Sequence, residues 1–257
     1  MEKSLTYILG AGASFQSIPV VKTFNQRLLK FKEFLLSESN HTRVSPKLKK
    51  RYDEAAYLYE MLFNEFSSHH SFDTYFKKLF HLGDSKNINR KKRLLNLYFF
   101  WEHSKNSMGY NSWNEEGWNE KDFYKESLFD KRYDALIAGL LKPFSGRTEV
   151  VSDINFITWN YDINLLNSIK SFFSPDIEYG KFISRIQKNQ FVWEIDKRIK
   201  IINVNGFFYS NDLEKVKDLS NLNFAEILEK KLSSGYHSNL EIDEDADKIR
   251  FAWELSE

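Results

Sequence analysis

The sequence contains no cysteine among its 257 residues. This absence excludes disulfide bonds, thiolate chemistry and zinc sites built from cysteine. No stretch approaches the roughly 18–20 uninterrupted apolar residues that a membrane-spanning helix needs. The short apolar run that follows Met1-Glu2-Lys3 has no signal-peptide cleavage site. We therefore expect a cytoplasmic protein that makes no membrane contact.

The sequence also lacks a clear excess of either charge. It has 37 Lys and Arg against 36 Asp and Glu, a formal net charge of +1. Phosphate binding is driven by excess positive charge, so no direct nucleic-acid binding is expected. At this length, with 42% hydrophobic residues, we expect one domain, or one domain with a large insertion.

Aromatic residues are abundant, at 16% of the chain, whereas Gly and Pro number only 10 and 4. One interpretation is a helix-rich core packed with large rings. The other is an aromatic platform that stacks single-stranded bases. The first is favoured, because the rings are not interleaved with basic residues along a strand pattern.

Apolar spacing predicts where strands and helices lie. Residues 5–9 form a short apolar, β-favouring run that stops at Gly10, as a buried parallel strand does. Residues 21–36 and almost all of 44–142 have apolar residues at helical intervals, apart from a polar loop over 104–120. Further along, the pattern predicts strands at 154–158 and 200–204, a helix at 161–173, and weaker strands at 191–195 and 249–253. Strands that alternate with helices favour an α/β fold with a mainly parallel sheet.

Two basic runs, residues 47–51 and 89–93, sit at expected helix starts. We interpret both as solvated helix faces, and the acidic run 241–247 as an exposed loop.

A glycine-containing turn follows the first expected strand. In Gly10-Ala11-Gly12-Ala13-Ser14 the glycines permit a tight turn and close approach to a pyrophosphate, and the next helix start supplies amide hydrogens. The full GxGxxG fingerprint is not met, because Phe15 takes the place of its third glycine. The turn is therefore either a phosphate cradle or a plain strand-to-helix connection.

Polar residues end two further expected strands. Thr158, Asn160 and Asp162 alternate after an apolar run, and alternate residues of an extended segment point the same way. Asn205-Gly206 follows the run at 200–204 and is by itself a turn signal. The carboxyl ends of strands line the ligand crevice of an open α/β sheet, which makes these residues candidates for a site. The alternative is that Asn160 or Asp162 only caps the next helix.

Four segments together resemble the bacterial sirtuin-like family. They are Gly10-Ala11-Gly12-Ala13-Ser14 with Ile18-Pro19, Ser71-Phe72-Asp73-Thr74-Tyr75, Thr158-Trp159-Asn160-Tyr161-Asp162, and Phe251-Ala252-Trp253-Glu254. The resemblance covers nearly the whole chain. It implies a Rossmann-like NAD-binding domain made of residues 1–40 and 150–257, with a helical insertion subdomain over 41–149 after the first strand, loop and helix.

The resemblance also implies a function. Family members without a four-cysteine zinc module, which a chain without cysteine cannot build, are typically NAD glycohydrolases in antiphage defence that deplete NAD, and not deacylases. The implied reaction releases nicotinamide and ADP-ribose from NAD, with no metal. A homo-oligomer or a partner defence protein is expected.

By the family match, Asn160 would hold the nicotinamide ribose and the attacking water, and Asp162 would orient neighbouring groups or the nicotinamide end. The expected cofactor-binding residues are Gly10, Ala11, Gly12, Ala13, Ser14, Pro19, Thr158 and Gly206.

Two departures leave alternatives open. Asn205-Gly206 stands where the family has a catalytic histidine and glycine, and an amide cannot take up a proton near neutral pH. The chain is then either a hydrolase, a weak or inactive module that binds NAD or ADP-ribose, or a degenerate structural domain. In addition, the sequence shows no match to the family's last strand with its glycine–x–serine turn. The alternatives are that the chain is a fragment, a divergent version, or a protein completed by a partner chain.

Overall fold

A computed structural model describes residues 4–41, 43–110, 127–144, 147–150, 152–186, 192–196, 198–205, 215–233 and 251. Its strands are β1 (Ser4–Leu9), β2 (Leu141–Phe144), β3 (Arg147–Val150), β4 (Asp153–Thr158), β5 (Val192–Asp196) and β6 (Ile199–Asn203). Its α-helices are α1 (Val21–Ser39), α2 (Pro46–Ser67), α3 (Phe72–His81), α4 (Ser85–Glu102), α5 (Lys131–Leu140), α6 (Asn164–Phe173), α7 (Tyr179–Ile186) and α8 (Phe224–Ser233). Short 3-10 helices are η1 (Ala11–Ser14), η2 (Lys105–Tyr110) and η4 (Leu219–Asn221).

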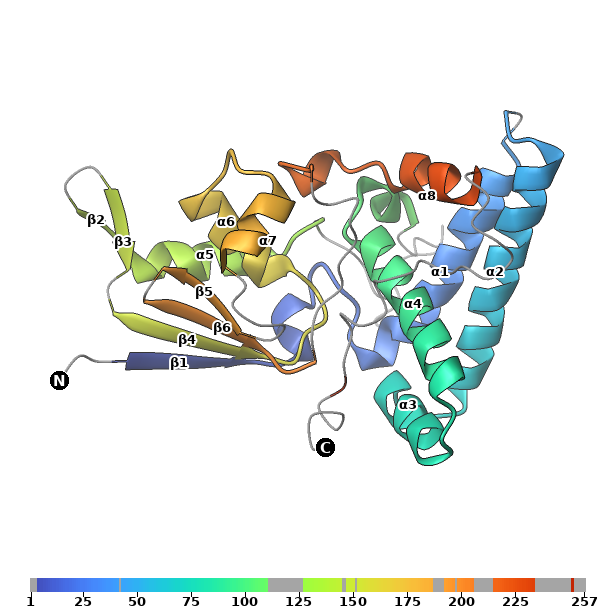
Figure 1. Cartoon of the computed structure of the whole chain (residues 1–257), viewed down its shortest axis with the longest axis horizontal. Coiled ribbons are helices and arrows are strands. Elements are labelled where there is room, and N and C mark those ends of the chain that lie inside the picture. The colour runs from blue at the N-terminus through green and yellow to red at the C-terminus, as the bar shows by residue number, and fades with distance from the viewer. Residues whose placement is uncertain are drawn as a thin grey trace, which may run out of the picture.

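The main sheet has four strands in the order β1-β4-β6-β5. Strands β1, β4 and β6 are parallel, and β5 runs antiparallel to β6. In β4 buried residues alternate with partly exposed ones, and helices α6 and α7 lie on the buried face (Figure 1). The fold is therefore α/β and Rossmann-like, and the expectation of a mainly parallel sheet is confirmed.

The helical part lies beside the sheet, with α1, α2, α4 and α8 packed together and α3 at one end (Figure 1). Side chains define where the helices begin. Ser45 accepts a hydrogen bond from the Leu48 amide at the start of α2, and Ser71 accepts one from Thr74 in α3. Asp84 caps α4 in the same way. Each such cap satisfies an amide that would otherwise lack a partner, typically adding about 1 kcal/mol.

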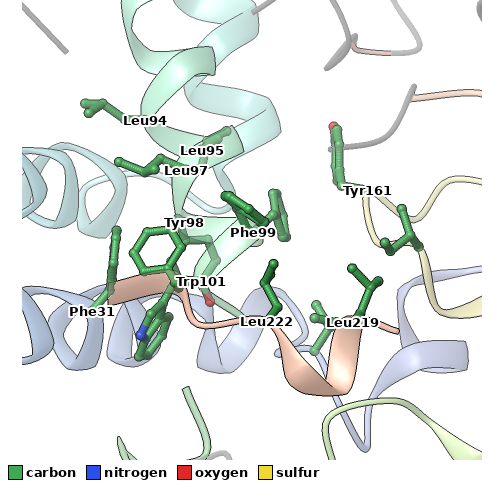
Figure 2. Packing of buried hydrophobic residues seen from close by; sticks show 14 of the residues in the cluster. Phe31, Leu94, Leu95, Leu97, Tyr98, Phe99, Trp101, Tyr161, Leu219 and Leu222 are labelled. Atoms are coloured by element: carbon green, nitrogen blue, oxygen red, sulfur yellow. The ribbon is translucent and has the colours of Figure 1, made fainter. Parts of the chain in front are cut away.

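Large rings fill the centre of this helical part, as Figure 2 shows for Phe31, Tyr98, Phe99 and Trp101. The rings of Phe31 and Tyr59 meet edge to face at 4.6 Å between centroids, and Phe31 lies 5.0 Å from Trp101. Such pairs add roughly 0.5–1.5 kcal/mol each beyond their burial. For these rings the interpretation as a helical core is confirmed.

Several expectations about elements need correction. Residues 141 and 142, expected to be the end of the helical stretch, belong instead to β2, which pairs antiparallel with β3. The helix expected from residue 161 begins only at Asn164, because the Asp162 carboxylate accepts the Asn164 amide hydrogen and holds the chain in a turn. Helices α7 and α8 were not predicted. The weak strand at 191–195 is confirmed as β5, whereas of 249–253 only residue 251 lies within the described residues.

The second basic run is not wholly a solvated face. Lys92 is only 6% exposed, and its ammonium group lies 5.3 Å from the centroid of the Phe251 ring. Buried cation–π contacts stabilise by about 2 kcal/mol. The acidic run 241–247 lies outside the described residues.

The polypeptide crosses between the two parts several times. Helix α1 packs against α2 in the helical part, whereas α5 packs against α6 beside the sheet. The domain boundaries at residues 40 and 150 stay predictions. No helix within the described ranges is long and apolar enough to cross a membrane.

Candidate functional site

The three polar strand ends meet at one edge of the sheet. The register pairs Leu9 with Thr158 and Thr158 with Asn203, so the residues that follow each strand emerge side by side. Backbone hydrogen bonds continue past the strands, from Trp159 N to Leu9 O at 3.3 Å and from Val204 N to Thr158 O at 2.9 Å. The expected clustering of these segments at the carboxyl edge is what the parallel topology produces.

The glycine turn forms η1, with the Ala13 amide donating to Gly10 O at 2.9 Å. Neither Gly10 nor Gly12 has a positive φ, so backbone strain does not require glycine here. A Cβ atom added at either residue would meet no described atom within 4 Å. The space beside both glycines is therefore open, so a bulky anion could approach the turn closely.

Ser14, Asn160 and Tyr133 form a buried polar cluster. Asn160 Nδ2 donates to Ser14 Oγ at 3.1 Å and to the Tyr133 hydroxyl at 3.4 Å, and that hydroxyl lies 3.1 Å from Ser14 Oγ. Burial raises the pKa of Tyr133 well above its usual range, so the phenol stays protonated near neutral pH. The cluster joins the glycine turn to the end of β4 through a residue of α5. Sequence reasoning missed Tyr133, because nothing in the spacing of α5 distinguishes it from a core residue.

Two residues at the start of α5 make further hydrogen bonds to the glycine turn and the residues after it. Asp130 accepts from the Gln16 amide at 3.3 Å, and Arg132 Nη2 lies 3.3 Å from Ala13 O. Burial alone would raise the pKa of Asp130, but hydrogen bonds from Arg132 outweigh it and hold that pKa below its usual value. Sequence reasoning missed both residues. The only signal is that Asp130 precedes a helical pattern, as a helix cap does.

Asp162 organises the turn that leads into α6. Its Oδ1 accepts from Asn164 N at 2.9 Å and from Asn164 Nδ2 at 2.8 Å. Asn164 Oδ1 in turn accepts from Ser17 Oγ at 3.1 Å and from the Asp130 amide at 3.0 Å. Burial raises the pKa of the Asp162 carboxyl. The N-cap of α6 is Ile163, without a side-chain cap, so neither Asn160 nor Asp162 is the N-cap. The described hydrogen bonds of Asp162 instead hold the turn before the helix.

Two amide side chains at the strand ends have an acceptor oxygen without a partner. Asn160 is 6% exposed and Asn205 is 8% exposed, and Oδ1 of each receives no hydrogen bond from the described residues. Their NH2 groups are engaged, with Asn205 Nδ2 donating to Trp159 O at 3.0 Å. A buried polar atom without a partner costs about 1–3 kcal/mol, so both oxygens favour a ligand that donates hydrogen bonds.

A small recess adjoins Asn160. Tyr133, Thr158, Asn160, Asp162 and Asn203 supply its polar lining. Apolar side chains of Ile163, α6 and β6 supply the rest. Its interior leaves room for roughly one water molecule. Ser14 and Asn205 do not line it. A ribose is too large for this recess.

Tyr161 anchors the site to the helical part. Its ring stacks on Phe99 of α4 at 5.6 Å and lies 5.5 Å from Phe72 of α3 and 6.2 Å from Phe251. Figure 2 shows Tyr161 and Phe99 as members of the same cluster of buried residues. Three of the four segments that suggested the family resemblance thus pack on one another, and the fourth meets Asn160 through Ser14.

A buried histidine that sequence reasoning missed supports the same loop. His103 Nε2 accepts from the Ile163 amide at 3.4 Å, and Nδ1 lies 2.8 Å from Phe99 O. His103 therefore joins the end of α4 to the chain after Asp162. No pattern in the sequence sets this histidine apart from the other five.

The remaining expected site residues are placed as follows. Thr158 is buried at the end of β4, where its hydroxyl accepts a hydrogen bond from the main-chain N–H of Asn160 at 3.1 Å. Ala11 begins η1, and Pro19 is buried two residues before α1. Gly206 lies outside the described residues.

Comparison with protein-family models, curated sequences and solved structures gives no match to this chain. Within the described part of the chain, no group of three or more His, Asp or Glu side chains is placed to hold a metal ion.

Proposed function

We propose that the chain binds NAD at this strand edge and hydrolyses its nicotinamide–ribose bond, giving nicotinamide, ADP-ribose and a proton. The observation that carries the proposal is the pair of buried amide oxygens, Asn160 Oδ1 and Asn205 Oδ1, that no described donor satisfies. A ribose offers adjacent hydroxyl donors, which suit two acceptor oxygens on neighbouring strand ends. The open space beside Gly10 and Gly12 suits the pyrophosphate.

The residues divide the work as follows. Nicotinamide leaves from an already cationic ring, so the site has chiefly to orient the substrate and stabilise developing charge. Asn160 binds the ribose and borders the recess whose size suits one water molecule. Asn205 accepts a hydrogen bond from a ribose hydroxyl but cannot take its proton. Asp162 holds Asn164 and so keeps the turn beside the recess in place.

The proposal is tested by two measurements on the same purified protein, nicotinamide release from NAD and equilibrium binding of NAD. We expect both binding and slow release. Binding without release would replace the hydrolase by the second candidate function below. If neither is detected, the proposal for NAD fails altogether.

The second candidate function is an NAD- or ADP-ribose-binding module without turnover. Asn205 favours it, because the Asn205 amide is tied to the Trp159 carbonyl and supplies no base. Loss of a general base typically lowers the rate about 10²–10⁴-fold.

Histidine at this position should restore a base. We expect Asn205→His to raise nicotinamide release by at least about 10-fold, since the imidazole can take up a proton near neutral pH. The gain should disappear at a pH below the histidine pKa, which a pH–rate profile measures. An unchanged rate together with unchanged NAD binding would show that residue 205 does not face the reacting ribose.

We expect Tyr133 to influence turnover through its hydrogen bonds with Asn160 and Ser14. Removing only its hydroxyl, in Tyr133→Phe, leaves the Asn160 amide less well fixed, and we expect kcat to fall up to about 10-fold. KM for NAD should change less than kcat. Tyr59→Phe is the matched control, because the Tyr59 hydroxyl is also buried and donates to Leu94 O at 2.8 Å, but within the helical part. Equal losses in both variants would mean that Tyr133 contributes only stability.

The sequence resemblance supports a wider role. We propose that the protein is a sirtuin-like NAD-depleting enzyme of antiphage defence that acts in the cytoplasm, where NAD is available. It would work as a homo-oligomer or with a partner defence protein. Measuring NAD in cells that express the wild type or Asn160→Ala, with and without phage, tests this role.

A further inference from the structure

Strand β1 forms one edge of the main sheet, and its outer side pairs with no described strand. Natural sheets protect such edges with lysine, proline, bulges or very short strands. The six residues of β1, Ser4–Leu9, include no charged residue, no proline and no glycine. The register with β4 is continuous over all six residue pairs, without a bulge. Within the described residues, therefore, nothing in the sequence or register of β1 blocks pairing with another strand at this edge.

The side chains of β1 leave apolar surface exposed on both faces of the sheet. Leu5 is 43% exposed on the helix-covered face, where Tyr7 stacks on Phe156. Ile8 is 67% exposed on the opposite face. There the register places Ile8 beside Ile157 and Ile157 beside Ile202, so one aliphatic row crosses three parallel strands. Parallel strands normally have both faces covered.

We propose that the outer edge of β1 pairs with β1 of a second copy of this chain, making a twofold dimer with a continuous sheet. A twofold interface requires a surface that complements itself. The segment 5–9 does so about Tyr7, because Leu5 mirrors Leu9 and Thr6 mirrors Ile8. A twofold axis perpendicular to the sheet keeps the two covered faces on one side.

In this register Tyr7 lies opposite Tyr7 of the partner subunit, and Leu5 lies opposite Leu9 of the partner subunit. Thr6 lies opposite Ile8 of the partner subunit on the other face. Aromatic and β-branched cross-strand pairs of this kind add roughly 0.2–1 kcal/mol each. The paired strands run antiparallel, so the two Gly10–Ser14 turns point to opposite ends of the joined sheet. Each site would be complete within its own subunit, and the dimer does not depend on the proposed reaction.

The register is tested with two double variants that differ in one charge. Thr6→Lys/Ile8→Lys places like charges opposite each other across the twofold axis, whereas Thr6→Lys/Ile8→Glu places opposite charges there. Both change the same exposed side chains, so monomer stability should be similar. Sedimentation equilibrium is measured from about 1 to 200 μM, a range suited to a weak interface.

We expect the wild type to dimerise within this range and the variant with like charges to dimerise at least about 10-fold more weakly. The variant with opposite charges should retain dimerisation. A monomeric wild type throughout the range would overturn the proposal. Equal dimerisation of both double variants would also overturn it, because the interface would then lie elsewhere.

A disulfide offers a second test, because the chain has no cysteine of its own. Tyr7→Cys would bring the two new thiols together, since Cα atoms of directly opposed antiparallel residues lie about 4.5–5.5 Å apart. That spacing suits a disulfide. In Ile8→Cys the two Cα atoms would be more than about 7 Å apart, which is too far. We expect oxidation to cross-link only Tyr7→Cys, and preferential cross-linking of Ile8→Cys would contradict the register.

Discussion

Replacing Asn160 with alanine is expected to lower nicotinamide release from NAD by at least about 10²-fold, the typical cost of removing one preorganised polar group at a reacting centre. Asn160 donates hydrogen bonds to Ser14 Oγ and to the Tyr133 hydroxyl, and it also lines the recess. Its loss removes the Oδ1 acceptor and the wall of the recess together. The measurement is single-turnover release with NAD in excess of its dissociation constant.

The fold should survive this substitution. Ser14 Oγ and the Tyr133 hydroxyl remain 3.1 Å apart and can still bond each other, so we expect a stability loss of about 1 kcal/mol. Asn155→Ala is the matched control, because Asn155 lies on β4, the strand before Asn160, and its side-chain amide donates to Ser4 Oγ at 3.0 Å on the opposite face. Turnover by Asn160→Ala equal to that of Asn155→Ala would remove Asn160 from the mechanism.

The strand edge of the site could be predicted because its signals are local. An apolar run that ends in alternating polar residues, as in 154–162, predicts both a strand and the face on which its polar side chains lie. The parallel arrangement then brings the ends of β1, β4 and β6 to one edge without further information. For this reason Ser14, Thr158, Asn160 and Asn205 were found from the sequence and do lie close together.

The contacts that α4 and α5 make with the strand edge could not be predicted, because each depends on pairs far apart in sequence. Tyr133 meets Ser14 across 119 residues, and His103 meets Ile163 across 60. Their helices have ordinary apolar spacing, so the sequence does not mark which buried tyrosine or histidine faces the site. Lys92 shows the same limitation, since a basic run gives no sign that one member lies against a distant ring.

A buried ion pair in the helical part is a further example of such a distant contact. Arg27 of α1 donates from Nε to Glu102 Oε1 at 2.8 Å and from Nη2 to Glu102 Oε2 at 3.0 Å. The Tyr98 hydroxyl donates to Glu102 Oε1 at 2.8 Å, and Arg27 Nη1 donates to Tyr110 O at 2.7 Å. Both charged side chains are almost completely buried. The network joins α1, α4 and η2 next to the aromatic core.

We expect Glu102→Gln to lower the free energy of unfolding by about 3–5 kcal/mol, because the buried Arg27 charge loses its counter-charge. Urea denaturation followed by far-UV circular dichroism measures the loss. Lys30→Met, which breaks the exposed pair of Lys30 with Glu33, is the control and should cost less than about 1 kcal/mol.

The double variant Arg27→Met/Glu102→Leu separates charge from packing. Replacing both ions by apolar side chains of similar size is often neutral or stabilising, so the double variant should regain most of the stability that Glu102→Gln loses. The hydroxyl of Tyr98 and the carbonyl of Tyr110 then lose a partner each, which limits the recovery by about 1–3 kcal/mol per buried group. A double variant less stable than Glu102→Gln would show that hydrogen bonds to these two groups, and not the uncompensated charge, dominate the energetics of the network.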